Sequence, residues 1–309
     1  MDPTTLQTAD GRKAWLEARR HGIGSSDVAA ICNLSPWSSP LHVYLSKVGE
    51  LEDYSNAPKR WGLRLEQNIA DAYAEETGRQ VRLPDTALTR HPQDHWLLAS
   101  IDRIAHVEGD PRIVECKHAS HHSEWGTPHT DEVPDYYNLQ VQHQMACSGI
   151  ACADLAVLLP GADFRVYTVT RNDALISKLR HICSDFWARV QRRVPPEPDW
   201  QHSQTLSLLK DLYGVDGHLS VDLRYEAVHD IREYVRLGQR VSEMIKEREQ
   251  SQARLLYHMG QAGLAKCEGY TLTRKTVRRK AYSVDPTSYV KFHVKSPHEA
   301  TMSKMEGES

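Results

Sequence analysis

An apolar stretch that carries two opposite charges constrains this chain more than any other feature. Residues 97–120 read LLASIDRIAHVEGDPRIVECKHAS, which is two apolar runs separated by a Gly-Asp-Pro turn. Side chains alternate along a strand, so Glu115 and Lys117 share one face of the second run. Burying an acid and a base in such a strand costs free energy unless both have partners.

A divalent cation is one partner that removes this cost. Asp102 and Glu115 would supply two carboxylates and the Cys116 backbone carbonyl a third oxygen, as a hard cation requires. Lys117 is then left to hold an attacking water and to help lower its pKa. A plain buried Glu–Lys or Asp–Lys ion pair is the alternative that this spacing leaves open.

The surrounding pattern predicts an α/β domain that ends at a Pro-rich linker. Helical patterns cover residues 11–32 (broken by glycines), 41–49, 61–77, 136–148 and 173–193. Strand patterns cover residues 80–107, 113–118 and a hairpin at 152–172. The linker VPPEPDW predicts a first domain of residues 1–195 and a second of residues 196–309.

The second part combines a long helix with a basic strand pair. Residues 221–262 carry one apolar stripe and a densely charged opposite face, and residues 270–284 alternate like a hairpin. The basic residues of this hairpin, flanked by Tyr270 and Tyr282, are Arg274, Lys275, Arg278, Arg279 and Lys280. They would either follow a DNA backbone or keep an exposed edge strand soluble.

Charge and composition limit the classes of partner. The formal net charge is −3, so DNA binding would need local positive charge. There is no run of eighteen apolar residues and no apolar signal segment at the N-terminus, so we expect no membrane span and a cytoplasmic location. Six scattered cysteines without a CxxC pair indicate reduced thiols instead of a disulfide framework.

Histidines gather in the segment after the charged strand, at positions 118, 121, 122 and 129. This segment contains Gly, Pro and Ser and lacks the cysteines or the helical spacing of a zinc site. We therefore interpret it as a loop at the mouth of a cleft and not as a set of metal ligands.

Asp102 followed by Glu115-Cys116-Lys117 is similar to the PD-(D/E)XK nuclease signature. Five ordered blocks resemble one branch of it, the lambda-exonuclease-like or YqaJ-type viral recombinases: WLEARRHGIGSSDVAAICNLSPWSSPLHVYLSKVGE, RWGLRLEQNIADAYAEETG, LLASIDRI, IVECKHAS and VPDYYNLQVQHQMACSG. The resemblance implies a restriction-endonuclease-like α/β core, with a mixed central sheet flanked by helices. A helical extension with a β-hairpin would follow this core.

The same resemblance assigns roles to residues outside the strand. Arg19 and Ser26, beside a glycine-opened turn, match residues that bind the 5′ phosphate of the degraded strand; helix capping is the alternative. Glu66 matches an additional metal or water ligand, and Gln140 a glutamine that bonds phosphate or ligand water. Ser100 matches a phosphate-contacting serine, and Tyr137, one turn before Gln140, would lie near the same place.

The resemblance implies an Mg²⁺- or Mn²⁺-dependent exonuclease with one or two ions. Its substrate would be the end of linear double-stranded DNA, resected 5′→3′ in phage-type recombination. The implied partners are a single-strand annealing protein and further copies of the chain in a ring-shaped trimer. An endonuclease or a Cas4-like nuclease of the same superfamily, or a non-catalytic DNA-binding module, are the alternatives.

Overall fold

The computed structural model describes residues 2–51, 57–216, 218–278, 292 and 294 of the chain. It divides into two compact units, Met1–Tyr213 and Gly214–Ser309. The helices of the first unit are η1 (Pro3–Gln7), α1 (Ala9–Arg20), α2 (Ser25–Ile31), α3 (Pro40–Val48), α4 (Ala57–Thr77), α5 (Asp135–Ser148), η2 (Pro160–Ala162), α6 (Asp173–Gln191) and α7 (Thr205–Leu212). Its strands are β1 (Ile23–Gly24), β2 (Val81–Arg82), β3 (Thr89–Arg90), β4 (Leu97–Ala99), β5 (Arg103–Val107), β6 (Asp110–His118), β7 (Cys152–Leu159) and β8 (Asp163–Thr170).

The first unit is built around a five-stranded mixed sheet in the order β2-β5-β6-β7-β8. Strands β6 and β7 run parallel, and the other neighbours run antiparallel. A parallel pair needs a long crossover connection, and the segment that contains α5 provides it. The expected mixed central sheet flanked by helices is confirmed.

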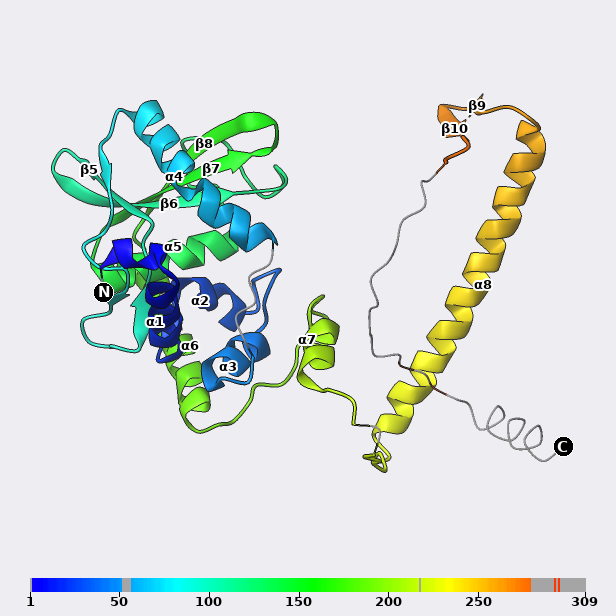
Figure 1. The fold of residues 1–309 in the computed structure, drawn as a ribbon, viewed down its shortest axis with the longest axis horizontal. Coiled ribbons are helices and arrows are strands. Elements are labelled where there is room, and N and C mark those ends of the chain that lie inside the picture. Colours follow the sequence, from blue (N-terminus) through cyan, green and yellow to red (C-terminus); the bar gives the residue numbers. More distant parts are fainter. Residues whose placement is uncertain (1, 52–56, 217, 279–291, 293, 295–309) are drawn as a thin grey trace. The chain divides into compact units, whose positions relative to one another are not determined.

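Helices α4 and α5 cover opposite faces of this sheet (Figure 1). Val114 packs with Ile69 and Tyr73 of α4, whereas Ile113 on the other face packs with Val141 and Met145 of α5. Because both faces are covered, β6 is apolar at both alternating sets of positions. Glu115, on the same face as Ile113, is therefore directed toward α5.

A smaller sheet has the order β1-β4-β3, and β2 of the large sheet lies between β1 and β3 in the chain. Strand β4 pairs with β1 and β3, whereas β5 pairs with β2 and β6. The chain therefore changes sheets between Ala99 and Arg103. The strand pattern predicted over residues 80–107 is wrong at Ser100 and Asp102, because both lie in this connection and not in a strand.

The predicted C-terminal ends of α3, α4 and α5 agree with the observed ones to within one residue. Ser39 caps α3 by accepting a hydrogen bond from the His42 N–H, and Pro40 occupies the first turn. Gly49 and Gly149 follow α3 and α5 with φ of 82° and 76°, in the left-handed region that glycine adopts without steric cost.

The boundary between the units follows α7, whereas the Pro-rich linker predicted it at residues 195–196. Leu208 of α7 is only 2% exposed and belongs to the same apolar cluster as Val190 of α6. The linker thus connects two helices of the first unit.

The second unit contains α8 (Ala227–Met259), β9 (Leu264–Cys267) and β10 (Tyr270–Thr273). Strands β9 and β10 form an antiparallel hairpin through Glu268 and Gly269. The extension of helix and hairpin is confirmed, but the hairpin precedes the basic segment that was expected to form it. Arg274, Lys275 and Arg278 follow β10 in non-strand backbone, and the predicted positions Arg279, Lys280 and Tyr282 lie outside the described residues.

Among the helices of the described residues, none combines the length and the apolar character that a membrane span requires.

Candidate active site

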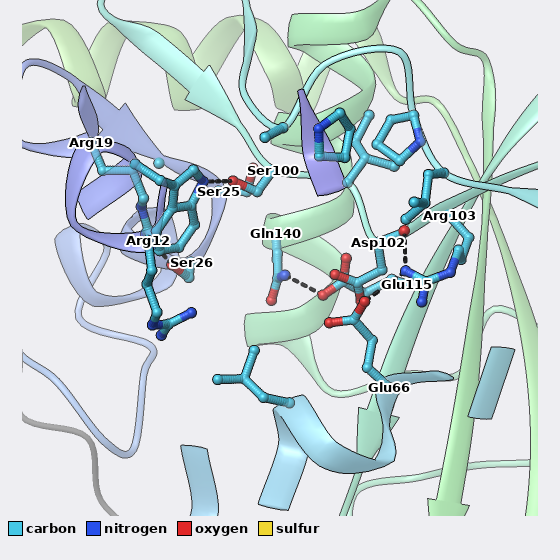
Figure 2. A pocket seen from close by; sticks show the side chains of 18 of the residues that line it. Arg12, Arg19, Ser25, Ser26, Glu66, Ser100, Asp102, Arg103, Glu115 and Gln140 are labelled. Carbon is cyan, nitrogen blue, oxygen red and sulfur yellow. Dashed lines mark hydrogen bonds and ion pairs between the residues drawn. The ribbon is translucent and has the colours of Figure 1, made fainter. Parts of the chain in front are cut away.

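A cavity of about 590 Å³ brings together residues from both ends of the predicted site. Its wall includes Glu66 of α4, Asp102, Glu115 of β6 and Gln140 of α5. The same cavity is lined by predicted phosphate-binding residues, namely Arg19, Ser26 and Ser100. Figure 2 shows the arginine and serines facing the carboxylates across the pocket.

Glu115 is the most heavily bonded carboxylate of the cavity. Only 3% of the residue is exposed. Its Oε1 accepts hydrogen bonds from Lys117 Nζ at 2.7 Å and from Gln140 Nε2 at 2.5 Å. Its Oε2 accepts one from Gln144 Nε2 at 2.7 Å. Three donors therefore hold the carboxylate in one orientation.

Asp102 lies next to this carboxylate without an ion pair of its own in the described structure. Its Oδ2 accepts a hydrogen bond of 2.9 Å from the Cys116 backbone N–H. Burial raises the pKa of the Asp102 carboxyl well above its usual value, and the negative charges of Glu115 and Glu66 raise it further. A dication at this place would remove the repulsion, so the donor set fits a hard cation.

Side chains alone do not complete such a cation site. Across the described residues, no group of three or more His, Cys, Asp or Glu side chains is gathered closely enough to hold a metal ion. An ion at Asp102 and Glu115 would also need backbone and water oxygens, as Mg²⁺ usually does. The Cys116 carbonyl, predicted from the sequence, belongs to this category of ligand.

Lys117 has a protonated and well-anchored side chain. Burial lowers the pKa of its ammonium, but the charge of Glu115, with those of Tyr137 and Asp102, more than offsets this, and the net shift is upward. Nζ also donates to Gln140 Oε1 at 3.0 Å and lies 4.6 Å from the centre of the Tyr137 ring. Lys117 is thus a hydrogen-bond donor and a positive charge, not a base.

Arg19 and Ser26 form the predicted pair on the opposite wall. Arg19 Nη2 donates to Ser26 Oγ at 2.7 Å, and the guanidinium lies 4.7 Å from the centre of the Trp15 ring. Gly24 makes room for it, because a Cβ atom there would lie 2.8 Å from Arg19 Nη2. The sequence indicates this requirement only by the glycine itself.

Asp27 contacts Arg19 of this Arg19–Ser26 pair and holds its guanidinium in place. Its Oδ1 lies 3.5 Å from Arg19 Nη2, and its Oδ2 forms a salt bridge of 2.6 Å with Lys47 Nζ. Burial raises the pKa of the Asp27 carboxyl, but the charges of Lys47 and Arg19 lower it more, to about 2. The anchoring carboxylate therefore stays ionised at neutral pH.

Two predicted residues have partners within the protein. Ser100 Oγ accepts a hydrogen bond of 3.1 Å from Trp15 Nε1, at the cavity wall. Tyr137 does not line the cavity; its ring packs against Trp125 and beside Lys117. In the histidine-containing segment, His122 Nε2 lies 3.3 Å from Asp163 Oδ2.

Two residues without a role predicted from the sequence touch the carboxylates. Gln144, fully buried, donates to Glu115 and to the Ser100 carbonyl. Arg103, 7% exposed, donates to Glu66 Oε1 at 2.6 Å. The available signals were the four-residue spacing of Gln140 and Gln144 on one helical face and a charged residue within an apolar strand.

Comparison with known families agrees with this arrangement. Residues 14–151 match the family model of the YqaJ-like viral recombinase domain. The matched segment contains the residues of both walls of the cavity from Trp15 to Gln140.

Individual proteins similar to this chain include a bacterial relative and several solved structures. The uncharacterized protein YqaJ of Bacillus subtilis (strain 168) is 29% identical over 259 residues, which cover 81% of this chain and 79% of the relative. LHK-Exo in complex with dAMP is 25% identical, with a TM-score of 0.48, over 59% of this chain and 94% of that one. LHK-Exo is described as an alkaline exonuclease from Laribacter hongkongensis, and its other structure is 22% identical with a TM-score of 0.47 and the same coverage.

Proposed function

We propose that this domain is a divalent-cation-dependent exonuclease that degrades one strand of linear double-stranded DNA from its 5′ end. The observation that carries the proposal is the shared cavity. It places the carboxylates of Asp102 and Glu115 and the cationic Arg19–Ser26 pair in one space. The similar LHK-Exo is named an alkaline exonuclease, which is consistent with this proposal.

Asp102, Glu115 and the Cys116 carbonyl are the groups that would hold the cation. When bound, Mg²⁺ or Mn²⁺ supplies Lewis-acid activation of water and of phosphoryl oxygens. Hydrogen bonds from Gln140 and Gln144 would orient the Glu115 carboxylate toward the cation. These two amides correspond to the second layer of hydrogen bonds that usually orients metal ligands.

Lys117 would act as a donor to the reacting phosphate or to the attacking water. Its pKa is shifted upward, so it keeps its proton at neutral pH and does not serve as the general base. Gln140 links Lys117 to Glu115 and lines the cavity. Movement of the ammonium relative to the cation site is thereby restricted.

Arg19 and Ser26 would bind the terminal 5′ phosphate of the strand. A guanidinium and a hydroxyl 2.7 Å apart present donors to the same anion, and Asp27 and Trp15 hold the guanidinium in place. Degradation from such an anchored end would leave a 3′-ended single strand. That product is the substrate of a single-strand annealing protein, the partner class that we propose.

The first test is the metal dependence of DNA degradation. Linear duplex should be degraded with Mg²⁺ and not with EDTA, and a covalently closed circle should stay intact. Glu115→Gln should lower the rate by about 100-fold or more, because the change removes a ligand charge. Glu108→Gln, the same change at an exposed position in the β5–β6 turn, is the matched control. Full activity of Glu115→Gln, measured as released nucleotides, would contradict the assignment.

The second test is the preference for phosphorylated ends. Arg19→Gln should abolish the difference in rate between 5′-phosphorylated and 5′-hydroxyl duplex, while Arg20→Gln should keep it. Arg20 pairs with Glu17 at the exposed side of the same helix and does not line the cavity. An unchanged ratio in Arg19→Gln would remove the proposed role of this residue.

A further inference from the structure

Arg103 is a buried cation in the acidic part of the cavity, and the proposed reaction gives it no role. Its Nη1 donates to Glu66 Oε1 and to the Asp102 backbone carbonyl, both at 2.6 Å. Its Nη2 donates to Gln67 Oε1 at 2.9 Å. Figure 2 shows the guanidinium next to Glu66 and Asp102. One side chain therefore joins α4 to the segment that carries Asp102.

This pairing leaves Glu66 poorly available as a metal ligand. The side chain of Arg103 is only 8% exposed, and a guanidinium cannot lose its charge in a protein. A dication bound to the same carboxylate would lie close to this buried guanidinium, which bonds Glu66 Oε1. The two positive charges would repel each other in surroundings of low dielectric constant.

The charges of the cavity favour the same conclusion. Glu115 is paired with Lys117 and Glu66 with Arg103, so Asp102 is the carboxylate of the three without an ion pair in the described structure. The carboxylates therefore leave one uncompensated negative charge, that of Asp102. One dication, together with the negative charge of one phosphodiester, would bring the total to zero. A second dication would leave two positive charges in excess in a site that is partly closed to water.

We infer that this domain binds one divalent cation per chain, at Asp102 and Glu115, and that the Arg103 guanidinium takes the place of a second cation at Glu66. The inference rests on the proposed nuclease function and specifies its metal content. Arg103 acts as a positioning residue, because it fixes Glu66 and the backbone of Asp102.

Mn²⁺ binding to the full chain tests this inference without measuring catalysis. Equilibrium dialysis should give about one Mn²⁺ per chain, both for the free protein and for the protein with bound DNA. The DNA is a 5′-phosphorylated duplex with phosphorothioate terminal linkages, which resist cleavage. Paramagnetic resonance should show an uncoupled Mn²⁺ signal. Two-ion sites hold their ions about 3.5–4 Å apart, which produces an exchange-coupled signal. Two ions per chain with a coupled signal would overturn the inference.

Variants at Arg103 separate its charge from its shape. Arg103→Gln releases Glu66 and should allow a second Mn²⁺, whereas Arg103→Lys keeps the charge and should keep one. Arg112→Gln is the matched control, because Arg112 pairs with Asp154 on the neighbouring strands, away from the cavity. A single ion in a folded Arg103→Gln variant would contradict the role of the guanidinium.

Glu66→Gln keeps the test decisive if Arg103→Gln does not fold. The number of bound Mn²⁺ ions should stay at one per chain in this variant. A natural protein that binds two ions and loses one of them in Glu66→Gln would overturn the inference. Failure of the proposed function is a separate result, since it appears as DNA degradation in EDTA or as no degradation at all.

Discussion

His143 is a buried residue beside the site whose protonation state depends on its packing. It is 3% exposed, and its Nε2–H donates to the Leu98 carbonyl at 3.1 Å. Burial lowers the pKa of its imidazole from 6.5 to about 4, although the Leu98 carbonyl and the charge of Asp27 oppose this shift; His91 adds to it. The folded protein therefore holds His143 neutral over a range in which the unfolded chain binds a proton.

This difference predicts a loss of stability on acidification. Between pH 6.5 and 4 only the unfolded state takes up the proton, so the free energy of unfolding falls as the pH falls. His143→Gln lacks this contribution. The stability difference between the natural protein and the variant should shrink by about 2 kcal/mol from pH 7 to pH 5, measured by urea denaturation.

A control for this measurement is available at an exposed position. His106 lies exposed on β5, and His106→Gln is the same substitution outside the core. A difference for His143→Gln that stays constant from pH 7 to pH 5 would show that the imidazole is not held neutral.

At the level of elements, a buried ion network joins three strands of the sheet to α4. Asp154 of β7 is fully buried and accepts from Arg112 of β6, Thr168 of β8 and Arg79, which follows α4. Tyr73 of α4 also donates to it, at 2.6 Å. One carboxylate thus connects three neighbouring strands and the helix that carries Glu66.

Asp154→Ala should destabilise the first unit by about 3–5 kcal/mol, because it leaves two arginines without their buried counter-charge. Asp163→Ala removes a partly exposed pair with Arg165 and should cost much less, because solvent screens such a pair. Urea denaturation of both variants measures the contrast. Equal losses would mean that burial of the Asp154 network adds nothing to its strength.

At the level of the whole molecule, the cavity and all its ligand candidates lie in the first unit. Helix α7 belongs to this unit because Leu208 is buried in its core. A chain ending at Tyr213 should therefore fold and degrade DNA, whereas a chain ending at Pro195 should lose at least about 2 kcal/mol of stability. Urea denaturation of the two shortened chains, with the full chain as reference, measures this. Equal stability would show that α7 contributes nothing to the core.

The sequence alone was sufficient for most helices of the first unit and for part of the site. Alternation in RIVECK places Glu115 and Lys117 on one face, and the structure brings their charged groups within 2.7 Å. Glycines at the ends of α3 and α5 marked where those helices stop. Such features depend on neighbours one to four residues apart, so local steric and hydrogen-bonding rules determine them.

The tertiary structure decided which partners each charged group has. Gln144 is 29 residues from Glu115 in the chain, and Arg103 is 37 from Glu66, so no local pattern connects them. Both contacts arise because α5 and α4 pack on opposite faces of one sheet and direct their side chains toward the end of β6. The sequence determined that an acid and a base share a strand. Only packing determined that Glu115 is held by Gln144 and that Glu66 is already occupied by Arg103, because those distances depend on how separate elements are placed in space.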